Sequence, residues 1–90
     1  MNQQIPTTTF IQLIKKSGVL GRTGYSSSTL YNRINEGTFC PPIALGARGV
    51  AYVEYEVQAV LRAMVAGKTK AELQILVQTL VLMLTYKVLA

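Results

Sequence analysis

The stretch that most constrains this fold is residues 23–37, with the sequence TGYSSSTLYNRINEG, in which two glycines and a serine are signals for the ends of helices. Gly24 is expected to end one helix. The hydroxyl of Ser26 can accept a backbone N–H group that the start of the next helix leaves free. Gly37 suits the left-handed conformation that commonly ends a helix. The stretch therefore predicts a helix between Ser26 and Gly37, joined to a preceding helix by a tight turn.

This predicted helix has one apolar and one polar face. Leu30 and Ile34 are four residues apart, so they share one side of the helix and can be buried together. The other side carries Ser27, Ser28, Tyr31, Asn32 and Asn35. A tight turn before such a helix is typical of a DNA-reading helix-turn-helix, in which Asn pairs with adenine edges and Arg33 can hold a phosphate. An ordinary amphipathic surface helix has the same pattern, and that alternative stays open.

Basic charge is concentrated in the half of the chain that contains this helix. The 90 residues include nine Lys or Arg and four acids, a formal net charge of +5. Residues 1–50 hold five basic side chains against one acid, a balance of +4, and residues 51–90 hold four against three, a balance of +1. A polyanionic partner would require this distribution, although ordinary solubility charge explains a total of this size as well.

The sequence contains few residues of the kinds that form metal sites or enzymatic sites. The chain has no His and a single Cys, Cys40, whereas a structural zinc needs about four such ligands. A lone Cys suits a reducing cytoplasm, and the N-terminus shows no basic-then-apolar leader. No nucleophile or acid–base constellation is visible. We therefore expect a cytoplasmic, non-enzymatic protein without metal, cofactor or small-molecule substrate.

Before the helix predicted between Ser26 and Gly37, which we call the reading helix, the chain is expected to contain three short segments. Residues 1–9 form a polar arm, and residues 10–14 form a short apolar strand or an approach segment under the core. Two lysines that face solvent or a phosphate follow, Lys15 and Lys16. Ser17 can cap a first helix over residues 18–23, which its two glycines make dependent on packing.

A β-hairpin is expected after the reading helix. Pro41 and Pro42 stop the helix and extend the chain. Apolar runs at residues 43–45 and 50–52 flank a four-residue link that contains glycine, which predicts the hairpin. A hairpin directly after a helix-turn-helix is a wing. Arg48 at its tip can contact a phosphate or enter the minor groove, or can simply be a solvated turn residue.

A third helix completes the predicted domain. Residues 54–66 have apolar side chains at the spacing of a core-facing helix, and Gly67 closes it. The expected fold class is therefore mainly α with a small β-hairpin wing: a winged helix-turn-helix over residues 10–66, followed by an apolar C-terminal helix over residues 69–89.

The C-terminal helix is predicted to begin with a capping box, because Thr69 and Glu72 have the required spacing. A helix over residues 70–88 would be about 28 Å long and apolar on nearly every side, so it must be buried. Its Gln, Thr and Lys residues argue against a membrane span.

We expect this helix to pack partly on the third helix and partly on a second copy, in a homodimer or higher homo-oligomer. Paired reading helices would then suit repeated or inverted half-sites. The predicted oligomerisation stripe consists of Leu73, Leu76, Val77, Leu80, Met83, Leu84 and Val88.

The segment GYSSSTLYNRINEGTF at residues 24–39 resembles the G-L-S-R-S-T-I-Y-R…EG-x-F segment of AlpA-type prophage regulators. A second segment, PIALGAR at residues 42–48 followed by Tyr52, Glu56 and Val57, resembles their P-V-x-L-G-x-R…W…EV segment. The resemblance covers roughly residues 10–66. It implies a small winged-helix DNA binder related to MerR-type domains and excisionases. Such a protein would regulate prophage or integrative-element genes, acting on integrase expression or as a recombination directionality factor.

The same resemblance implies where DNA contacts lie. Carried over residue by residue, these positions are Ser26, Ser28, Thr29, Tyr31 and Arg33 on or beside the reading helix and Arg48 at the wing. Three departures remove basic side chains, because Ser27, Pro41 and Ala44 stand where the family often has Arg, a basic residue and Lys. Each loss removes a possible phosphate contact, so DNA affinity should be lower and less salt-sensitive than for a typical member.

Two functions follow as hypotheses. The first is a sequence-specific regulator that binds double-stranded DNA. Its phosphate contacts would come from Lys15, Lys16, Arg33 and Arg48, and its base contacts from Ser27, Ser28, Tyr31, Asn32 and Asn35. The alternative is an oligomeric adaptor that uses the winged-helix fold and its apolar C-terminal helix to bind protein. The modest basic charge keeps this alternative open, and salt-dependent DNA retention would discriminate the two.

Overall fold

The computed structural model describes the backbone of residues 11–47 and 49–89 and the side chains of residues 11–47 and 49–83. The predicted arm at residues 1–9, Phe10, Arg48 and the side chains of Leu84 and Val88 lie outside the described residues. In chain order the elements are β1 (Leu13–Ile14), α1 (Lys16–Thr23), α2 (Ser27–Asn35), β2 (Ile43–Ala44), β3 (Val50–Val53), α3 (Glu54–Val65) and α4 (Lys70–Leu89). The predicted fold class, mainly helical with a small sheet, is confirmed.

The sheet has three antiparallel strands in the order β1-β3-β2. The predicted wing hairpin is present, because β2 pairs with β3 in the register Ile43↔Ala51. The segment expected as a strand or an approach segment is a strand, β1, which pairs with the other edge of β3 in the register Leu13↔Val53. The Glu54 N–H donates to the Gln12 carbonyl at 2.8 Å, so α3 begins where the sheet ends.

The ends of α1 and α2 lie where Gly24, Ser26 and Gly37 predicted them. Gly24 ends α1 with φ +77°, and its N–H donates to the Leu20 carbonyl at 2.8 Å. The Ser26 hydroxyl accepts the Thr29 N–H at 3.2 Å and caps α2. Gly37 after α2 has φ +85°, as predicted.

The predicted cap at Ser17 is wrong. Helix α1 begins two residues earlier than predicted, at Lys16, and Lys15 is the capping position, without a side-chain hydrogen bond. The reason is that β1 ends at Ile14 and Lys15 keeps the extended conformation of the strand, with ψ 162°. The Lys15 carbonyl then accepts the first helical N–H groups, from Gly18 at 2.9 Å and Val19 at 3.1 Å.

One buried cluster joins all four helices and the sheet. Its members are Val19, Leu30, Phe39, Cys40, Tyr52, Val57, Val60, Val77 and Leu80. The largest fully buried side chain is Phe39, and the ring of Tyr25 meets it edge-on with centroids 6.0 Å apart. Because Val77 and Leu80 belong to α4, that helix is part of the same core and not only an appendage of it.

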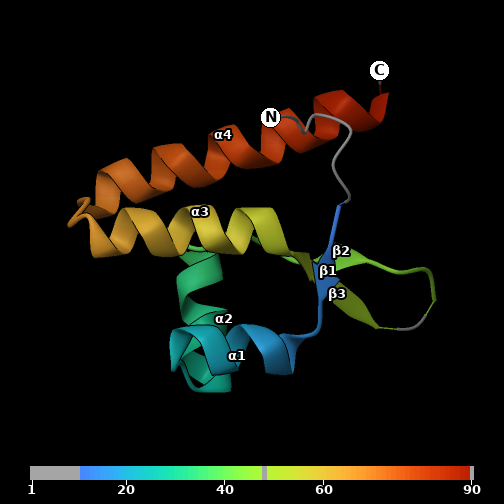
Figure 1. Ribbon diagram of the computed structural model, residues 1–90, viewed down its shortest axis with the longest axis horizontal. Helices are drawn as coiled ribbons and strands as arrows, with labels where there is room; N and C mark the ends of the chain where they lie inside the picture. The colour runs from blue at the N-terminus through green and yellow to red at the C-terminus, as the bar shows by residue number, and fades with distance from the viewer. Residues whose placement is uncertain (1–10, 48, 90) are drawn as a thin grey trace, which may run out of the picture.

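Helix α4 runs back along α3 toward the sheet, while α1 and the start of α2 lie on the other side of α3 (Figure 1). Gly67, with φ +81°, lies at the reversal between α3 and α4. The predicted capping box is confirmed: Glu72 accepts the Thr69 N–H at 2.8 Å, and Thr69 accepts the Glu72 N–H at 3.2 Å. Among the described residues, no helix is both long enough and apolar enough to span a membrane.

Candidate nucleic-acid interface

Helix α2 is two-faced as its spacing predicts. Leu30 is buried and Ile34 half-buried against the core. The polar face is exposed along its whole length, with Ser27, Ser28, Tyr31, Asn32 and Asn35 accessible to solvent. Tyr31 has the largest side chain on this face and is 66% exposed. These side chains are therefore free to contact another molecule.

A shallow depression of about 270 Å³ lies between α2, the start of α1 and the sheet. It is lined by Lys16, Ser27, Leu30, Tyr31, Ile34, Pro42, Val50 and Tyr52. It brings the predicted residues Lys16, Ser27 and Tyr31 to one surface, and none of its lining residues is acidic. We call this depression, together with the exposed polar side of α2 (Ser27, Ser28, Tyr31, Asn32, Arg33 and Asn35), the reading face.

Pro42 and Val50 belong to the reading face but were not among the predicted site residues. Sequence reasoning assigned the prolines only to ending the helix, and Val50 only to the returning strand. No signal in the sequence marked Val50 as part of this surface. Its exposure, beside three buried residues of β3, is known only from the structure.

Two of the predicted contact residues, Ser26 and Thr29, form hydrogen bonds with each other at the start of α2. The Ser26 hydroxyl accepts the Thr29 N–H and donates to the Thr29 hydroxyl at 2.9 Å. It also lies 3.3 Å from the hydroxyl of Ser28. Ser26 and Thr29 therefore position the reading face, while Ser28 has further hydrogen-bonding capacity for a ligand.

Arg33 is exposed on α2 but has a partner in the chain. Its Nη1 lies 2.9 Å from Oε2 of Glu36, and the Thr38 hydroxyl donates to the same oxygen at 2.9 Å. The hydrogen bond from Thr38, together with Arg33 and Lys70 nearby, lowers the pKa of the Glu36 carboxyl. Only Nη1 of Arg33 is recorded against Glu36, so the exposed guanidinium keeps N–H groups that can donate to a second partner.

The end of α2 is tied to the start of α4 through the same glutamate. The Gln74 side-chain amide donates to the Glu36 carbonyl at 2.7 Å, and Lys70 Nζ lies 3.7 Å from Oε1 of Glu36. No sequence pattern predicted this link, since Glu36 and Gln74 are 38 residues apart. This link fixes the orientation of α2 at the C-terminal end of the helix.

The remaining basic side chains of the N-terminal half differ in availability. Lys15 and Lys16 are exposed at the junction of β1 and α1. Arg22 is engaged, with Nη2 3.1 Å from Oε2 of Glu54. Arg48, the predicted wing contact, lies outside the described residues. Lys16 is therefore the basic residue that lines the depression, and the exposed Lys15 precedes it in the chain.

Two of the buried titratable groups are Cys40 and Glu56. Burial raises the pKa of the Cys40 thiol to about 12, which keeps it protonated and unreactive at neutral pH. Glu56 is also buried, and burial raises the pKa of its carboxyl. The described residues contain no group of three or more His, Cys, Asp or Glu side chains placed to hold a metal ion.

The predicted oligomerisation stripe on α4 is divided between the core and the surface. Val77 and Leu80 are buried in the core of the chain itself, and Leu73 and Leu76 are half-buried. Met83 is exposed. Among the side chains of α4 that the structure describes, the most exposed apolar ones are two that the stripe did not include, Ile75 at 64% and Leu82 at 68%.

The family model of the prophage CP4-57 regulatory protein (AlpA) matches residues 12–62, more than half of the chain. The chain belongs to the AlpA family of prophage regulatory proteins. A similar protein, the uncharacterized ORF88 of Enterobacteria phage P4, is 32% identical over 66 residues, which cover 73% of this chain and 75% of the phage protein. No solved structure matches the chain.

The AlpA match covers the elements that form the reading face and leaves out α4. It begins next to β1, includes both helices of the turn and the wing, and ends within α3. The resemblance noted from residues 24–39 and 42–48 is thereby confirmed. Helix α4 lies entirely beyond the matched residues, so its role has to be inferred from its own contacts.

Proposed function

We propose that this AlpA-family regulator acts by binding double-stranded DNA with the reading face, with α2 in the major groove. The observation that carries the proposal is the exposed polar face of α2, free of acids, set beside a wing and Lys16. A helix-turn-helix presents its second helix to base edges in this manner, and the wing can reach the neighbouring backbone.

Two kinds of contact divide the work of binding. Lys15, Lys16, Arg33 and Arg48 would hold phosphates, which positions the protein but carries no sequence information. Ser27, Ser28, Tyr31, Asn32 and Asn35 would face base edges, where an Asn amide pairs with adenine. Because the carboxylate of Glu36 offsets its charge, a phosphate contact from Arg33 would be weaker than one from an unpaired arginine.

The genes under control would be those of a prophage or integrative element. The protein would act on integrase expression or as an excision factor, and both roles need the same DNA-binding surface. A gel shift on the integrase promoter of the element and on its attachment site, against scrambled DNA, tests specificity. Selective retention of either fragment supports the proposal, and equal weak binding to all three contradicts it.

Salt dependence provides a second, quantitative test. If all four basic residues contact phosphates, the logarithm of the binding constant should fall by about 3.6 for each tenfold rise in salt. Lys16→Ala should reduce that slope by about 0.9. Lys68→Ala, which removes the same charge from the connection between α3 and α4, is the matched control and should leave the slope unchanged.

The second candidate function is a protein-binding adaptor. The exposed apolar side chains Ile75 and Leu82 favour it, because exposed apolar patches mark interaction sites. An adaptor would show no salt-dependent retention on DNA. The salt titration therefore separates the two functions.

A further inference from the structure

The outward polar side chains of α2 form a line with a flank on either side. The line consists of Ser28, Asn32 and Asn35, since steps of four and three residues keep side chains on one side of a helix. At about 100° per residue, Tyr31 lies to one side of Asn32 and Arg33 to the other. The Tyr31 flank and the Arg33 flank therefore face in nearly opposite directions.

Each flank has a lysine from another helix beside it. On the Tyr31 flank this is Lys16 of α1, within the depression of the reading face. On the Arg33 flank it is Lys70 of α4, within a second depression of about 310 Å³ between the end of α2 and the start of α4. The two depressions share no lining residue. Positive charge therefore lies on both sides of the polar line.

Glu36 holds the two basic groups of the second depression in place. Its Oε2 lies 2.9 Å from Nη1 of Arg33, and its Oε1 lies 3.7 Å from Nζ of Lys70. The Gln74 side-chain amide donates to the Glu36 carbonyl at 2.7 Å and keeps the start of α4 beside α2. Two positive groups against one carboxylate give this cluster a net charge of +1.

Both basic groups keep N–H donors for an anion. The side chains of Arg33 and Lys70 are 44% and 65% exposed. A guanidinium has five N–H donors and an ammonium has three, and Glu36 accepts only a part of them. An anion can therefore bind to this pair while Glu36 stays in place.

The two flanks fit the two strands that border a DNA major groove. An α-helix with its side chains is about 10–12 Å in diameter, and the major groove is about 12 Å wide. When the polar line faces the base edges, each flank faces one sugar–phosphate backbone. Lys16 then lies beside one strand and Lys70 beside the other.

We propose that Lys70 is a further phosphate contact, which together with Arg33 holds the backbone on one side of α2 while Lys16 holds the backbone on the other. This inference rests on the proposed function. It adds to that function a DNA contact from α4, which lies beyond the residues that the AlpA family model matches. Glu36 is the positioning residue for both cations.

The salt dependence of binding tests the contact. Lys70→Ala should lower the slope of the logarithm of the binding constant against the logarithm of salt by about 0.9, as Lys16→Ala should. The preferred fragment and scrambled DNA should lose affinity by the same factor, because a phosphate contact carries no sequence information. Lys70→Arg should retain the slope. Because Lys70 is exposed, the circular dichroism spectrum should not change.

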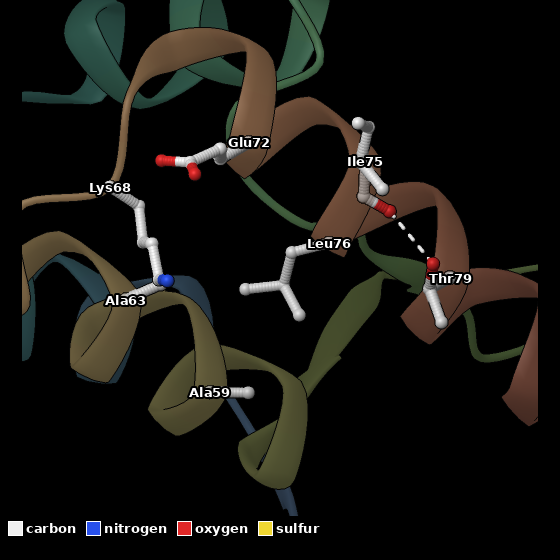
Figure 2. Close-up of a pocket in the computed structure, with 7 residues that line it drawn as sticks. All are labelled: Ala59, Ala63, Lys68, Glu72, Ile75, Leu76 and Thr79. Atoms are coloured by element: carbon white, nitrogen blue, oxygen red, sulfur yellow. Dashed lines mark hydrogen bonds between the residues drawn. The ribbon is translucent and has the colours of Figure 1, made fainter.

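Lys68→Ala is the matched control for Lys70→Ala. Lys68 lies two residues before Lys70 but lines a different surface, the groove between α3 and α4 that also includes Ala63 and Glu72 (Figure 2). Its removal subtracts the same charge from the chain and should leave the slope unchanged. Equal slopes for the wild type and Lys70→Ala, or equal reductions for Lys68→Ala and Lys70→Ala, would overturn the contact while the proposed function stands. A wild-type chain without salt-dependent binding would contradict the proposed function and the contact together.

Ethylation interference tests the arrangement across the groove. On a fragment with a single binding site, ethylation of phosphates on both strands should interfere with binding of the wild type. Lys16→Ala should lose interference on one strand, and Lys70→Ala should lose it on the other. Loss from the same strand in both variants would contradict the placement of the two lysines on opposite flanks of α2.

Discussion

Helices α2 and α4 begin in the same way and then differ in what they offer the surroundings. Each starts at a hydroxyl residue, Ser26 or Thr69, that accepts a backbone N–H. Each also contributes apolar side chains to one core. Beyond that, α2 presents serines, asparagines and a tyrosine to solvent, whereas α4 presents Ile75 and Leu82.

The difference shows how one small core can carry two kinds of interaction surface. A polar face is stable in contact with water. Because this one has no acidic side chain, a polyanion can replace the water without charge repulsion from it. Exposure of a second apolar face to water is unfavourable, and covering it with another apolar surface lowers the free energy. Glu36 joins the two helices, through Gln74 and Lys70 of α4, so the surfaces are held in a fixed relation.

The largest expected effect is on the free energy of unfolding. It distinguishes the side of α4 that faces the core from the side that faces solvent. Leu80→Ala should lower the free energy of unfolding by about 3 kcal/mol, because Leu80 is buried and its truncation leaves a cavity. Leu82→Ala is the matched control. At low protein concentration it should change stability by no more than about 0.5 kcal/mol. Urea denaturation measures both, and equal losses would mean that α4 has no distinct outer side.

A somewhat smaller effect is expected on the polar face of α2. Asn32→Ala should weaken binding to the preferred DNA fragment by about 2 kcal/mol, roughly thirtyfold, through loss of a paired amide. Gln78→Ala removes an exposed amide from α4 instead and should leave affinity unchanged. Fluorescence anisotropy gives both dissociation constants. If the two variants bound equally well, α2 would have no special part in recognition.

The caps provide a test of what the two helices share. Ser26→Ala and Thr69→Ala should each cost about 1 kcal/mol of stability, because each leaves a helical N–H without its acceptor. Ser28→Ala, in the first turn of α2, should cost much less. Thermal unfolding at one pH compares the three. A neutral Ser26→Ala variant would show that packing alone fixes the start of α2.

The smallest effect concerns the link between the helices and depends on pH. The pKa of Glu36 is lowered in the folded chain, so its contribution to stability is present above the ordinary value of 4.5 and is lost as pH falls below it. Glu36→Gln should therefore melt at a slightly lower temperature than the wild type at pH 7. That difference should shrink below pH 4.5. A difference that stays constant across this range would show that the charge of Glu36 does not contribute.

Local signals in the sequence predicted much of the fold. Gly24, Ser26 and Gly37 mark ends that backbone geometry dictates, and Thr69 with Glu72 marks a start. Ser17 had the chemistry of a cap, but the extended backbone inherited from β1 moved the helix start to Lys16.

Features that depend on distant contacts could not be predicted in this way. Pairing of β1 with β3, the link from Gln74 to Glu36 and the place of Val50 on the reading face all join segments that are far apart in sequence. On α4 the difficulty was different. A helix that is apolar on nearly every side gives no indication of which side is inner, and only packing assigned Val77 and Leu80 to the core.

Combined substitution of the reading face is the decisive measurement. The triple variant Tyr31→Ala, Asn32→Ala, Arg33→Ala alters exposed side chains, so the fold and the solution mass should be retained. We predict that its anisotropy titration shows affinity for the preferred fragment reduced by at least about a hundredfold, to the level of scrambled DNA. A folded triple variant that binds this fragment as tightly as the wild type would contradict the assignment of α2 as the helix that reads DNA.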